Sequence, residues 1–289
     1  MSDASSRRGF LRDIAIAAAR KLPDQPRAFS PPPEDPPSLL SDAEMERYSR
    51  QLLLPDWTED VQLTLRDASV LVIGAGALGS PVALYLAGAG VGRVGIVDSD
   101  VVEVSNLHRQ YLHYTPDTGV SKAESAAAKL RFLNPEIVVE TYPVWVDETN
   151  VAGLVESQDL VIDCTDSFAS RYTINAACCA AGVDLVEGGA TGWSGLVMTI
   201  LPRAGACYRC AFPTEPQDAP SCSEAGIIGP AAGVIGSLMA LEAIKLLSGT
   251  AAPLMDAFLT IDLATLDTTR VHVSRRANCP DCGSGPAGG

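Results

Sequence analysis

Short apolar runs and helically spaced apolar residues alternate along most of the chain. The runs are rich in β-branched side chains and predict strands near residues 69–74, 93–98, 137–146, 159–163 and 183–187. Apolar residues at helical spacing predict helices between them, near 78–89, 120–133, 147–156 and 168–181. This alternation is typical of an α/β fold with a Rossmann-like, doubly wound, mostly parallel sheet.

The pattern changes after Gly195. Strands are predicted there near 196–201, 258–262 and 268–273, with one long apolar helix near 230–247. Because these strands are not joined by regular crossover helices, we expect antiparallel additions to the same sheet. Upstream, Ser41 is suited to cap a helix that would run through Arg50.

The two ends of the chain differ from this middle part. Residues 23–40 are proline-rich and are typical of an extended linker that follows a short helical tail. The glycine-rich residues 284–289 are expected to be disordered. We therefore predict a tail and linker over 1–40 and a single domain over 41–283.

Composition limits the function classes. The formal charge of −14 argues against nucleic acid as a partner, because phosphate binding needs an excess of Lys and Arg. Every apolar run is interrupted before the roughly eighteen residues needed to span a bilayer, so no transmembrane helix or membrane partner is expected. Residues 6–12 resemble a twin-arginine export signal, but the apolar stretch 14–19 that follows is too short, so we expect a cytoplasmic protein.

A glycine-rich turn stands between the first core strand and the first core helix. Gly74, Gly76 and Gly79 permit a tight turn, and the amides and positive dipole at the helix start attract phosphate. Asp98 ends the second strand, where its carboxylate can accept from a ribose hydroxyl. Taken alone, these features indicate an NAD-dependent oxidoreductase.

Three further charged residues follow predicted strands or begin a predicted helix. Asp100 opens a polar loop, Lys122 lies at a helix start where the dipole disfavours a cation, and Asp166 follows the strand that ends at Asp163. Each alone is most simply a solvated loop charge. Because all three fall at the carboxyl edge of the sheet, together they favour a ligand site there.

Eight cysteines are present, and four form two Cys-x-x-Cys pairs, Cys207 with Cys210 and Cys279 with Cys282. Two such pairs predict a closed, structural four-thiolate zinc site, whereas a reducing cytosol disfavours the alternative of disulfides or a redox pair. We expect the core to contain the thiols at three further positions: Cys164, Cys178 and Cys179. Cys222 lies in a polar segment, where it is either a reactive thiol or a surface residue without a role.

These features together resemble the MoeB/ThiF/HesA family of the ubiquitin-activating superfamily, over roughly residues 45–283. The resemblance rests on the glycine turn, Tyr48-Ser49-Arg50-Gln51, Asp98-Ser99-Asp100, Ser105-Asn106-Leu107-His108-Arg109-Gln110, Lys122, Asp163-Cys164-Thr165-Asp166 and the paired cysteines. It implies that the chain uses ATP and Mg²⁺ to adenylate the C-terminal glycine of a small ubiquitin-like sulfur-carrier protein with a Gly-Gly end.

The resemblance also implies residue roles. Asp98 would bind the ribose, Asp166 would hold magnesium, and Arg50 would reach the site of a neighbouring subunit, so a homodimer is expected. Cys222 matches a crossover-loop cysteine that is catalytic in some members. The four paired cysteines would hold zinc, and the nucleotide would be bound by Gly74, Gly76, Ala77, Gly79, Asp100, Ser105, Asn106, Arg109, Lys122 and Ser167. Ser167 stands where many members have asparagine.

This reaction is chemically consistent with the residues present. A C-terminal carboxylate, with a pKa of about 3.3–3.7, is already ionised and needs no base, so His108, His113 and His272 are assigned no catalytic role. The obstacle is repulsion between two anions, which Arg50, Arg109, Lys122 and magnesium would offset. No sulfurtransferase segment follows the last cysteine pair, so a separate sulfurtransferase or sulfide donor is expected.

Three alternatives stay open from the sequence. The glycine turn with Asp98 suits an NAD-dependent oxidoreductase. Members of the same superfamily also adenylate short peptides. A zinc-stabilised adaptor that keeps the fold without the activity is disfavoured by the presence of Arg109, Lys122 and Asp166.

Overall fold

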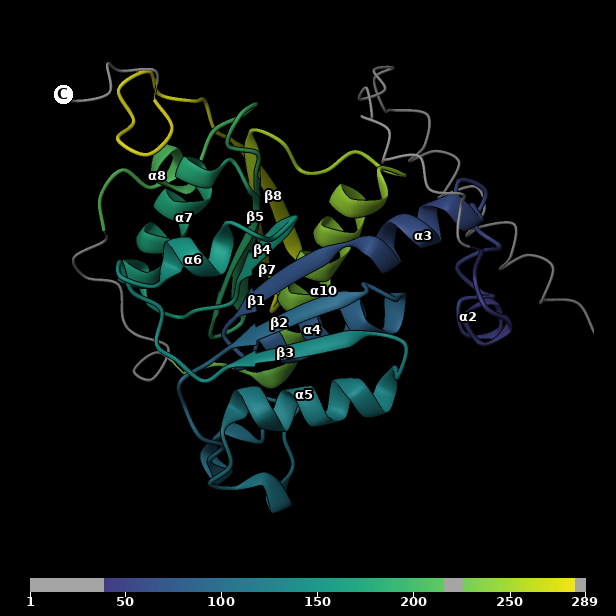
Figure 1. The fold of residues 1–289 in the computed structure, drawn as a ribbon. Coiled ribbons are helices and arrows are strands. Elements are labelled where there is room, and N and C mark those ends of the chain that lie inside the picture. The colour runs from purple at the N-terminus through teal and green to yellow at the C-terminus, as the bar shows by residue number, and fades with distance from the viewer. Residues whose placement is uncertain (1–38, 216–225, 284–289) are drawn as a thin grey trace, which may run out of the picture. The chain divides into compact units, whose positions relative to one another are not determined.

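One eight-stranded sheet organises the computed structural model, which describes residues 39–215 and 226–283 (Figure 1). The strand order is β3-β2-β1-β4-β5-β6-β7-β8. The strands are β1 (Ser69–Ile73), β2 (Arg93–Val97), β3 (Val138–Tyr142), β4 (Leu160–Asp163), β5 (Asp184–Thr191), β6 (Ser194–Ile200), β7 (Ala257–Asp262) and β8 (Asp267–His272). The first five pair in parallel, and β6, β7 and β8 are added antiparallel, which confirms the predicted fold class.

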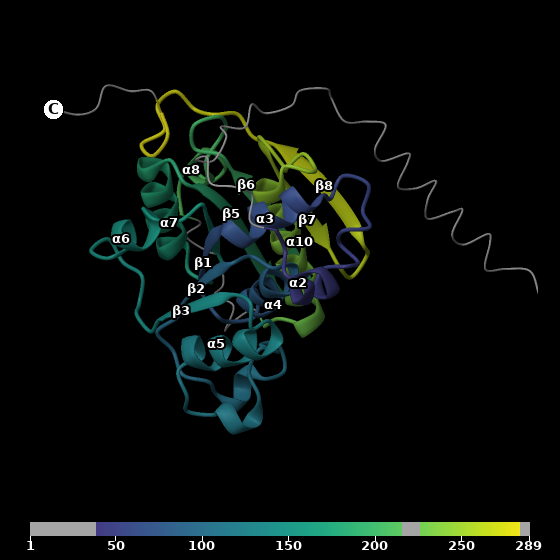
Figure 2. The same cartoon turned by 45° about the vertical axis from the view of Figure 1, so that its right-hand side comes forward.

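Helices cover both faces of the parallel part (Figures 1 and 2). On one face lie α4 (Gly79–Ala89), α5 (Lys122–Leu133) and α10 (Gly229–Ser248), with α3 (Glu59–Asp67) against α10. On the other lie α6 (Val151–Val155), α7 (Phe168–Ala181) and α8 (Tyr208–Ala211). The remaining short elements are α2 (Asp42–Arg47), η1 (Val104–Asn106) and η2 (Thr115–Asp117).

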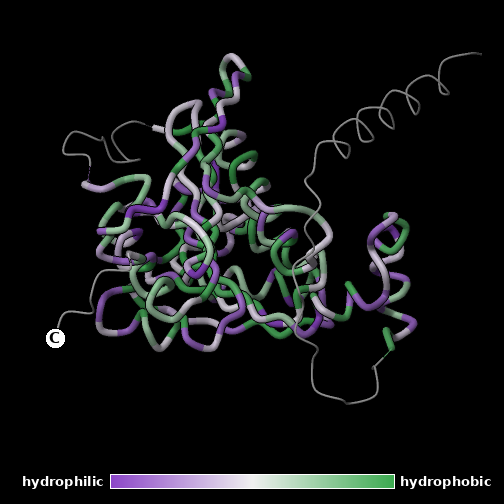
Figure 3. The backbone as a smooth tube through the Cα atoms, turned by 90° about the horizontal axis from the view of Figure 1, so that it is seen from above, coloured by the Kyte–Doolittle hydropathy of each residue, from purple (hydrophilic) through white to green (hydrophobic). Residues whose placement is uncertain are grey.

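The central strands β1, β2 and β4 are buried on both sides, which explains why they read as continuous apolar runs. In β1, Val70 and Val72 belong to the core beneath α4 and α10, while Leu71 and Ile73 belong to the core beneath α7. Successive side chains of a strand point to opposite faces, so one apolar strand supplies both cores. Figure 3 lets the reader follow this hydropathy pattern along the backbone.

Several predicted boundaries were wrong. The helix expected to reach Arg50 ends at Arg47, because Tyr48 turns inward, and its buried hydroxyl accepts a hydrogen bond from Asn134 at 2.9 Å. The strand expected to reach residue 146 ends at Tyr142, because Pro143 has no N–H to continue the ladder. The helix α3 was not predicted, although Thr58 caps it by accepting from the Val61 amide at 3.3 Å.

The helix α6 is shorter than expected and begins at Val151 rather than near residue 147. Asp147 instead forms a turn, in which its Oδ1 accepts from the Thr149 amide at 2.8 Å. Such side-chain turns compete with a helical start. The strand β5 is longer than expected and reaches Thr191, because β6 pairs with its whole length.

The helix α10 corrects the expectation that no apolar stretch is long enough to cross a membrane. Its 20 residues meet that criterion by length and composition alone. In the described structure it packs on β5, β6 and α4, as a core helix of a sheet protein does.

Candidate functional site

A cleft opens at the carboxyl ends of β1, β2 and β4. The chain continues from β1 to β2 and β3 on one side and returns as β4 and β5 on the other, so the cleft lies at the switch point of the sheet. Ligands of doubly wound folds bind at this point. The predicted residues that line it are Gly74, Gly76, Ala77, Asp98, Asp100, Arg109, Lys122 and Asp166.

Glycine has a different structural role at each of the three positions in the turn. Gly74 has φ +98°, a conformation that favours glycine, and a Cβ on Gly79 would lie 1.9 Å from the Gly74 carbonyl oxygen. Those two residues make the turn possible. A Cβ on Gly76 would meet only Gln110, at 3.5 Å, so its absence leaves room in the cleft itself. Among the described residues, no side chain caps the start of α4, so its amides are suited to a phosphate.

The peptide at Ala75 is held from both sides. Its N–H donates to Asp98 Oδ2 at 2.8 Å, and its carbonyl accepts from His113 Nε2 at 2.8 Å. The other ring nitrogen, Nδ1, lies 2.9 Å from Ser125 Oγ and accepts its proton in this tautomer. Asp98 Oδ1 also accepts from the Asp100 amide at 2.8 Å, so Asp98 and His113 together fix the turn. The sequence indicated no role for His113.

Burial lowers the pKa of His113, which is therefore neutral when the turn is intact. The unfolded value is 6.5, so this contribution to stability is complete above pH 6.5 and is lost as the pH falls below it. We expect the unfolding equilibrium constant, relative to that of the variant His113→Gln, to rise by up to about tenfold per pH unit as the pH is lowered below that value. Denaturant titrations at several pH values measure this.

The variant His113→Gln should lose this acid dependence, because glutamine does not titrate. The matched control is His272→Gln, which changes an exposed residue at the end of β8. Equal pH slopes in wild type and His113→Gln would contradict a neutral, buried His113.

Lys122 has a specific partner at the helix start. Its side chain is buried, at 7% exposure, and Nζ pairs with Asp100 Oδ2 at 2.8 Å, while its amide donates to the Asp100 carbonyl at 2.9 Å. The cation therefore stands at the cleft with one carboxylate beside it. This arrangement offsets the unfavourable position at the positive end of α5.

Arg109 and Gln110 form another wall of the cleft. Arg109 is half-buried, and its Nη1 donates to the Ser105 carbonyl at 3.1 Å. Gln110 is buried, and within the described residues its Oε1 has no hydrogen-bond partner. A buried amide without a partner beside Gly76 marks Gln110 as a site residue to which the sequence assigned no role.

A second, more apolar groove adjoins the cleft on the side of β6 and β7. Asp166, Arg171 and Ala190 line both cavities, so these residues form their common wall. Arg171 Nη2 donates to the Thr165 carbonyl at 2.8 Å and thereby holds the loop that carries Asp166. The other residues of the groove are Phe168, Gly189, Thr191, Ser194, Gly195, Leu196, Tyr208, Phe212, Thr260, Ile261 and Asp262.

Several predicted residues lie outside the lining of the cleft. Asn106 is buried and its Oδ1 accepts from the Glu103 amide at 3.2 Å, while Ser167 caps α7 by accepting from the Ser170 amide at 3.1 Å. Arg50 is exposed in the turn after α2. Ser105 and Gly79 also lie outside the lining, and Cys222 falls outside the described residues.

The site can neutralise and hold a polyanion. Lys122 and Arg109 supply positive charge, Gly76 leaves space, and the start of α4 offers backbone amides. Asp166 is an exposed carboxylate on the common wall, and carboxylate oxygen is a ligand that Mg²⁺ prefers. The residues present therefore fit a nucleotide triphosphate with a magnesium ion at Asp166.

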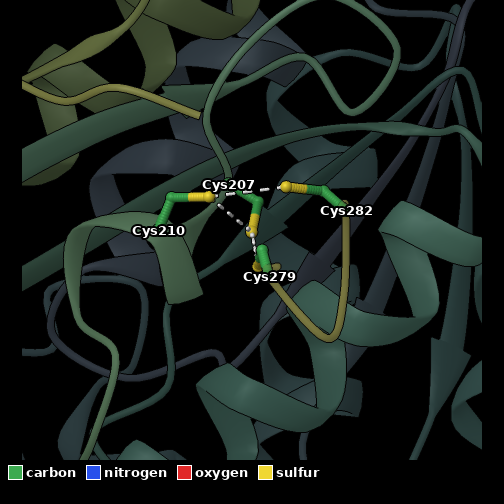
Figure 4. A group of neighbouring side chains, drawn as sticks. All are labelled: Cys207, Cys210, Cys279 and Cys282. Carbon is green, nitrogen blue, oxygen red and sulfur yellow. Dashed lines mark hydrogen bonds between the residues drawn. The ribbon is translucent and has the colours of Figure 1, made fainter. Parts of the chain in front are cut away.

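The four paired cysteines meet in space although about 70 residues separate the two pairs (Figure 4). Their sulfur atoms all lie within 4.8 Å of one another, and all four residues are buried. Cys207 Sγ lies 3.5 Å from Cys279 Sγ, and Cys210 Sγ lies 3.5 Å from Cys282 Sγ. Tetrahedral Zn–S bonds of about 2.3 Å imply S···S separations of about 3.8 Å, so the set fits zinc with no open position. The other predicted core thiols, Cys164 and Cys178, are buried, whereas Cys179 is partly buried.

Asp281, inside the second pair, ties this cluster to α7 and α8. Its Oδ2 accepts from Asn175 Nδ2 at 2.6 Å and from Arg209 Nε at 2.8 Å. Asn175 Oδ1 in turn accepts from the Tyr208 amide at 2.9 Å, and the Arg276 amide donates to Cys210 Sγ at 3.4 Å. These bonds orient the cysteine loops around the cluster.

Comparisons with known proteins show which proteins this chain resembles. A model of the ThiF family matches residues 48–281. The sulfur carrier protein adenylyltransferase of Thermus thermophilus is 44% identical over 250 residues, which cover 84% of this chain and 92% of that protein. The adenylyltransferase and sulfurtransferase MOCS3 of Mus musculus is 42% identical over 278 residues, 95% of this chain, and the chain spans only 60% of that relative's length.

Solved structures show the same fold. Escherichia coli MccB with ATP superposes with a TM-score of 0.74 at 25% identity, covering 82% of this chain and 74% of that one. PaaA gives a TM-score of 0.71 at 22% identity, covering 96% of this chain and 84% of that one.

Proposed function

Because the chain belongs to the ThiF family, we propose that it is an ATP-dependent adenylyltransferase that activates the C-terminal glycine of a small ubiquitin-like sulfur carrier. The observation that carries this proposal is the common wall of Asp166, Arg171 and Ala190 between the two cavities. The cleft suits a nucleotide triphosphate, and the groove suits an extended chain end. A carboxylate that lies in the groove would therefore meet the α-phosphate at Asp166.

The reaction needs charge neutralisation rather than proton transfer. A carboxylate oxygen of the carrier bonds to the α-phosphorus, the bond to the β-phosphate oxygen breaks, and pyrophosphate leaves with the electron pair. The carboxylate is already ionised, so no base is required. Lys122 and Arg109 would bind the phosphates, and a magnesium ion at Asp166 would neutralise developing charge on their oxygens.

The groove would select a narrow chain end whose last residues carry no side chains. Its floor comes from backbone and small side chains of β5 and β6 together with apolar rings, including Gly189, Gly195 and Phe212. A Gly-Gly end has no side chains to exclude, so it would pass into this space in extended form. We propose that the resulting acyl-adenylate is passed to a separate sulfurtransferase or sulfide donor.

We further propose a homodimer in the cytoplasm in which Arg50 completes the site of the second copy. Arg50 is exposed and lies outside the cleft of its own chain, which supports a contact in trans. Arg50 of the second copy would then supply a third positive charge at the triphosphate, in addition to those of Lys122 and Arg109.

The decisive test is exchange of labelled pyrophosphate into ATP. We expect exchange that requires both Mg²⁺ and a small carrier protein ending in Gly-Gly, because only formation of the acyl-adenylate releases pyrophosphate reversibly. A carrier lacking its last glycine is the control and should give none. Tight binding of NAD without protection by ATP against thermal unfolding would instead support an oxidoreductase. Exchange that requires only a short peptide would indicate that the substrate is a peptide rather than a carrier protein.

A further inference from the structure

Two carboxylates face each other in the centre of the sheet, beneath the common wall of the two cavities. Asp163 ends β4, and Glu187 is its register partner on β5. Both side chains are fully buried, at 0% exposure. They lie on the face of the sheet that α7 covers, as do Val161 and Leu185, two residues before each of them.

The described residues around this pair supply one cation for two carboxylates. Arg171 Nη1 donates to Glu187 Oε1 at 2.6 Å, and Asp163 Oδ1 accepts from the Thr165 amide at 2.8 Å. The remaining oxygens, Asp163 Oδ2 and Glu187 Oε2, have no donor within the described part of the chain. Two ionised carboxylates would leave one uncompensated negative charge in the core, which is costly.

A single proton between the two free oxygens accounts for both the missing donor and the uncompensated charge. It provides the missing donor, and it reduces the net charge of Asp163, Glu187 and Arg171 to zero. The pKa of Glu187 is consistent with a retained proton. Burial, which has the larger effect, and the neighbouring Asp163 both raise this pKa, whereas Arg171 opposes the rise. The other titratable groups facing the pair are uncharged near neutral pH: Tyr208 on α8, Cys164 after β4 and Cys178 on α7.

The pair is connected to the site through Arg171. The guanidinium bonds Glu187 with one nitrogen and, with the other, the carbonyl of Thr165, the residue before Asp166. Gly189 leaves room for it, since a Cβ there would lie 3.0 Å from Arg171 Nη1 and would crowd the guanidinium. Arg171 is itself part of the wall between cleft and groove.

We propose that Glu187 is a positioning residue of the nucleotide site: it shares one proton with Asp163 and, through Arg171, holds the loop that carries Asp166. The role of that loop rests on the proposed function, whereas the shared proton does not. An ionised Glu187 would add a second negative charge beside the path of two anionic substrates. The protonated pair keeps Arg171 available to the loop without that repulsion.

The first test measures the proton itself. Glu187→Gln has the same shape, donates to Asp163 as the protonated acid does, and cannot ionise. The unfolded carboxyl has a pKa near 4.5 and the folded one a higher pKa, so folding retains a proton that unfolding releases, and the contribution of Glu187 to wild-type stability falls as the pH rises above 4.5. We expect the wild-type unfolding equilibrium constant, relative to that of Glu187→Gln, to rise by up to about tenfold per pH unit over this range.

Infrared spectroscopy provides a readout that is independent of stability. Wild type should show the carbonyl stretch of a buried, protonated carboxylic acid near neutral pH, and Glu187→Gln should lack it. The control is Glu242→Gln, which alters a buried glutamate on α10 that pairs with Lys245, and it should keep both the band and the wild-type pH slope. No such band in wild type, together with parallel pH slopes, would overturn the shared proton.

The second test measures positioning, as the dissociation constant of ATP with and without Mg²⁺. Glu187→Gln should bind Mg²⁺·ATP within about twofold of wild type, whereas Glu187→Ala, which leaves Arg171 without its carboxylate partner, should bind about tenfold more weakly. The loss should fall mainly on the Mg²⁺-dependent part, because the Asp166 loop is displaced. Equal affinities in all three proteins would remove the positioning role, while absence of ATP binding in wild type would instead refute the proposed function and leave the infrared result standing.

Discussion

Replacing Asp166 with alanine should reduce carrier-dependent pyrophosphate exchange by about 10²–10³-fold or more, the size of loss seen when one electrostatic stabiliser of a transition state is removed. Asp166 lies where the two cavities meet, and its exposed carboxylate would be the ligand of the proposed magnesium ion. Without it, two anions approach with less compensation. The rate at saturating ATP and carrier is the measurement, because the effect belongs to the chemical step rather than to binding alone.

Asp267→Ala is the matched control for this substitution. It removes an exposed carboxylate from the β7–β8 hairpin that is not part of the lining of either cavity, and should leave exchange unchanged. A similar thermal midpoint for both variants would exclude unfolding as the cause of the loss. Full exchange by Asp166→Ala would refute its role and count strongly against the proposed adenylation site.

The second large effect is expected on stability, when one of the four clustered cysteines is removed. In Cys279→Ala the four-sulfur cluster loses one member, and the segment after β8 loses one of its contacts with the start of α8. Structural zinc sites contribute directly to folding free energy, so we expect a loss of about 3 kcal/mol or more, a fall in thermal midpoint of roughly 6–12 °C. Zinc content by elemental analysis and the thermal midpoint are measured on the same preparation.

The matched control is Cys178→Ala, which removes a buried thiol from the same core without touching the cluster. It should lose some stability as a core truncation but retain about one zinc ion per chain. Purified wild type without zinc, or unchanged zinc content in Cys279→Ala, would contradict the assignment of the cluster as a metal centre.

Much of the fold was predictable because the parallel strands are buried on both faces. The run Val70 to Ile73 has no polar interruption, and only a strand covered by helices on both sides tolerates this. The ends of elements were less predictable, because they depend on contacts distant in sequence. The helix before Tyr48 stops where that ring reaches Asn134, 86 residues away, and no local pattern encodes this contact.

The candidate site likewise contains residues that local sequence signals indicate and residues whose placement depends on distant parts of the chain. Gly74, Lys122 and Asp166, which line the cleft, were predicted from local signals: a glycine turn, a cation at the positive end of a helix and an acidic residue just after a strand. Arg171 and Glu187 were missed, although an arginine within an apolar helix and a glutamate at the end of an apolar strand are comparable signals. Their meaning depends on the register that places Glu187 opposite Asp163, and periodicity alone does not reveal register.

The strand β5 belongs to both halves of the sheet, since it pairs in parallel with β4 and antiparallel with β6. One uninterrupted ladder of main-chain hydrogen bonds therefore joins the nucleotide cleft to the groove. Such a ladder offers no hinge about which the two could close. The spacing between the bound nucleotide and the incoming chain end is consequently established when the protein folds, and any motion that accompanies turnover has to arise in the loops around a rigid frame.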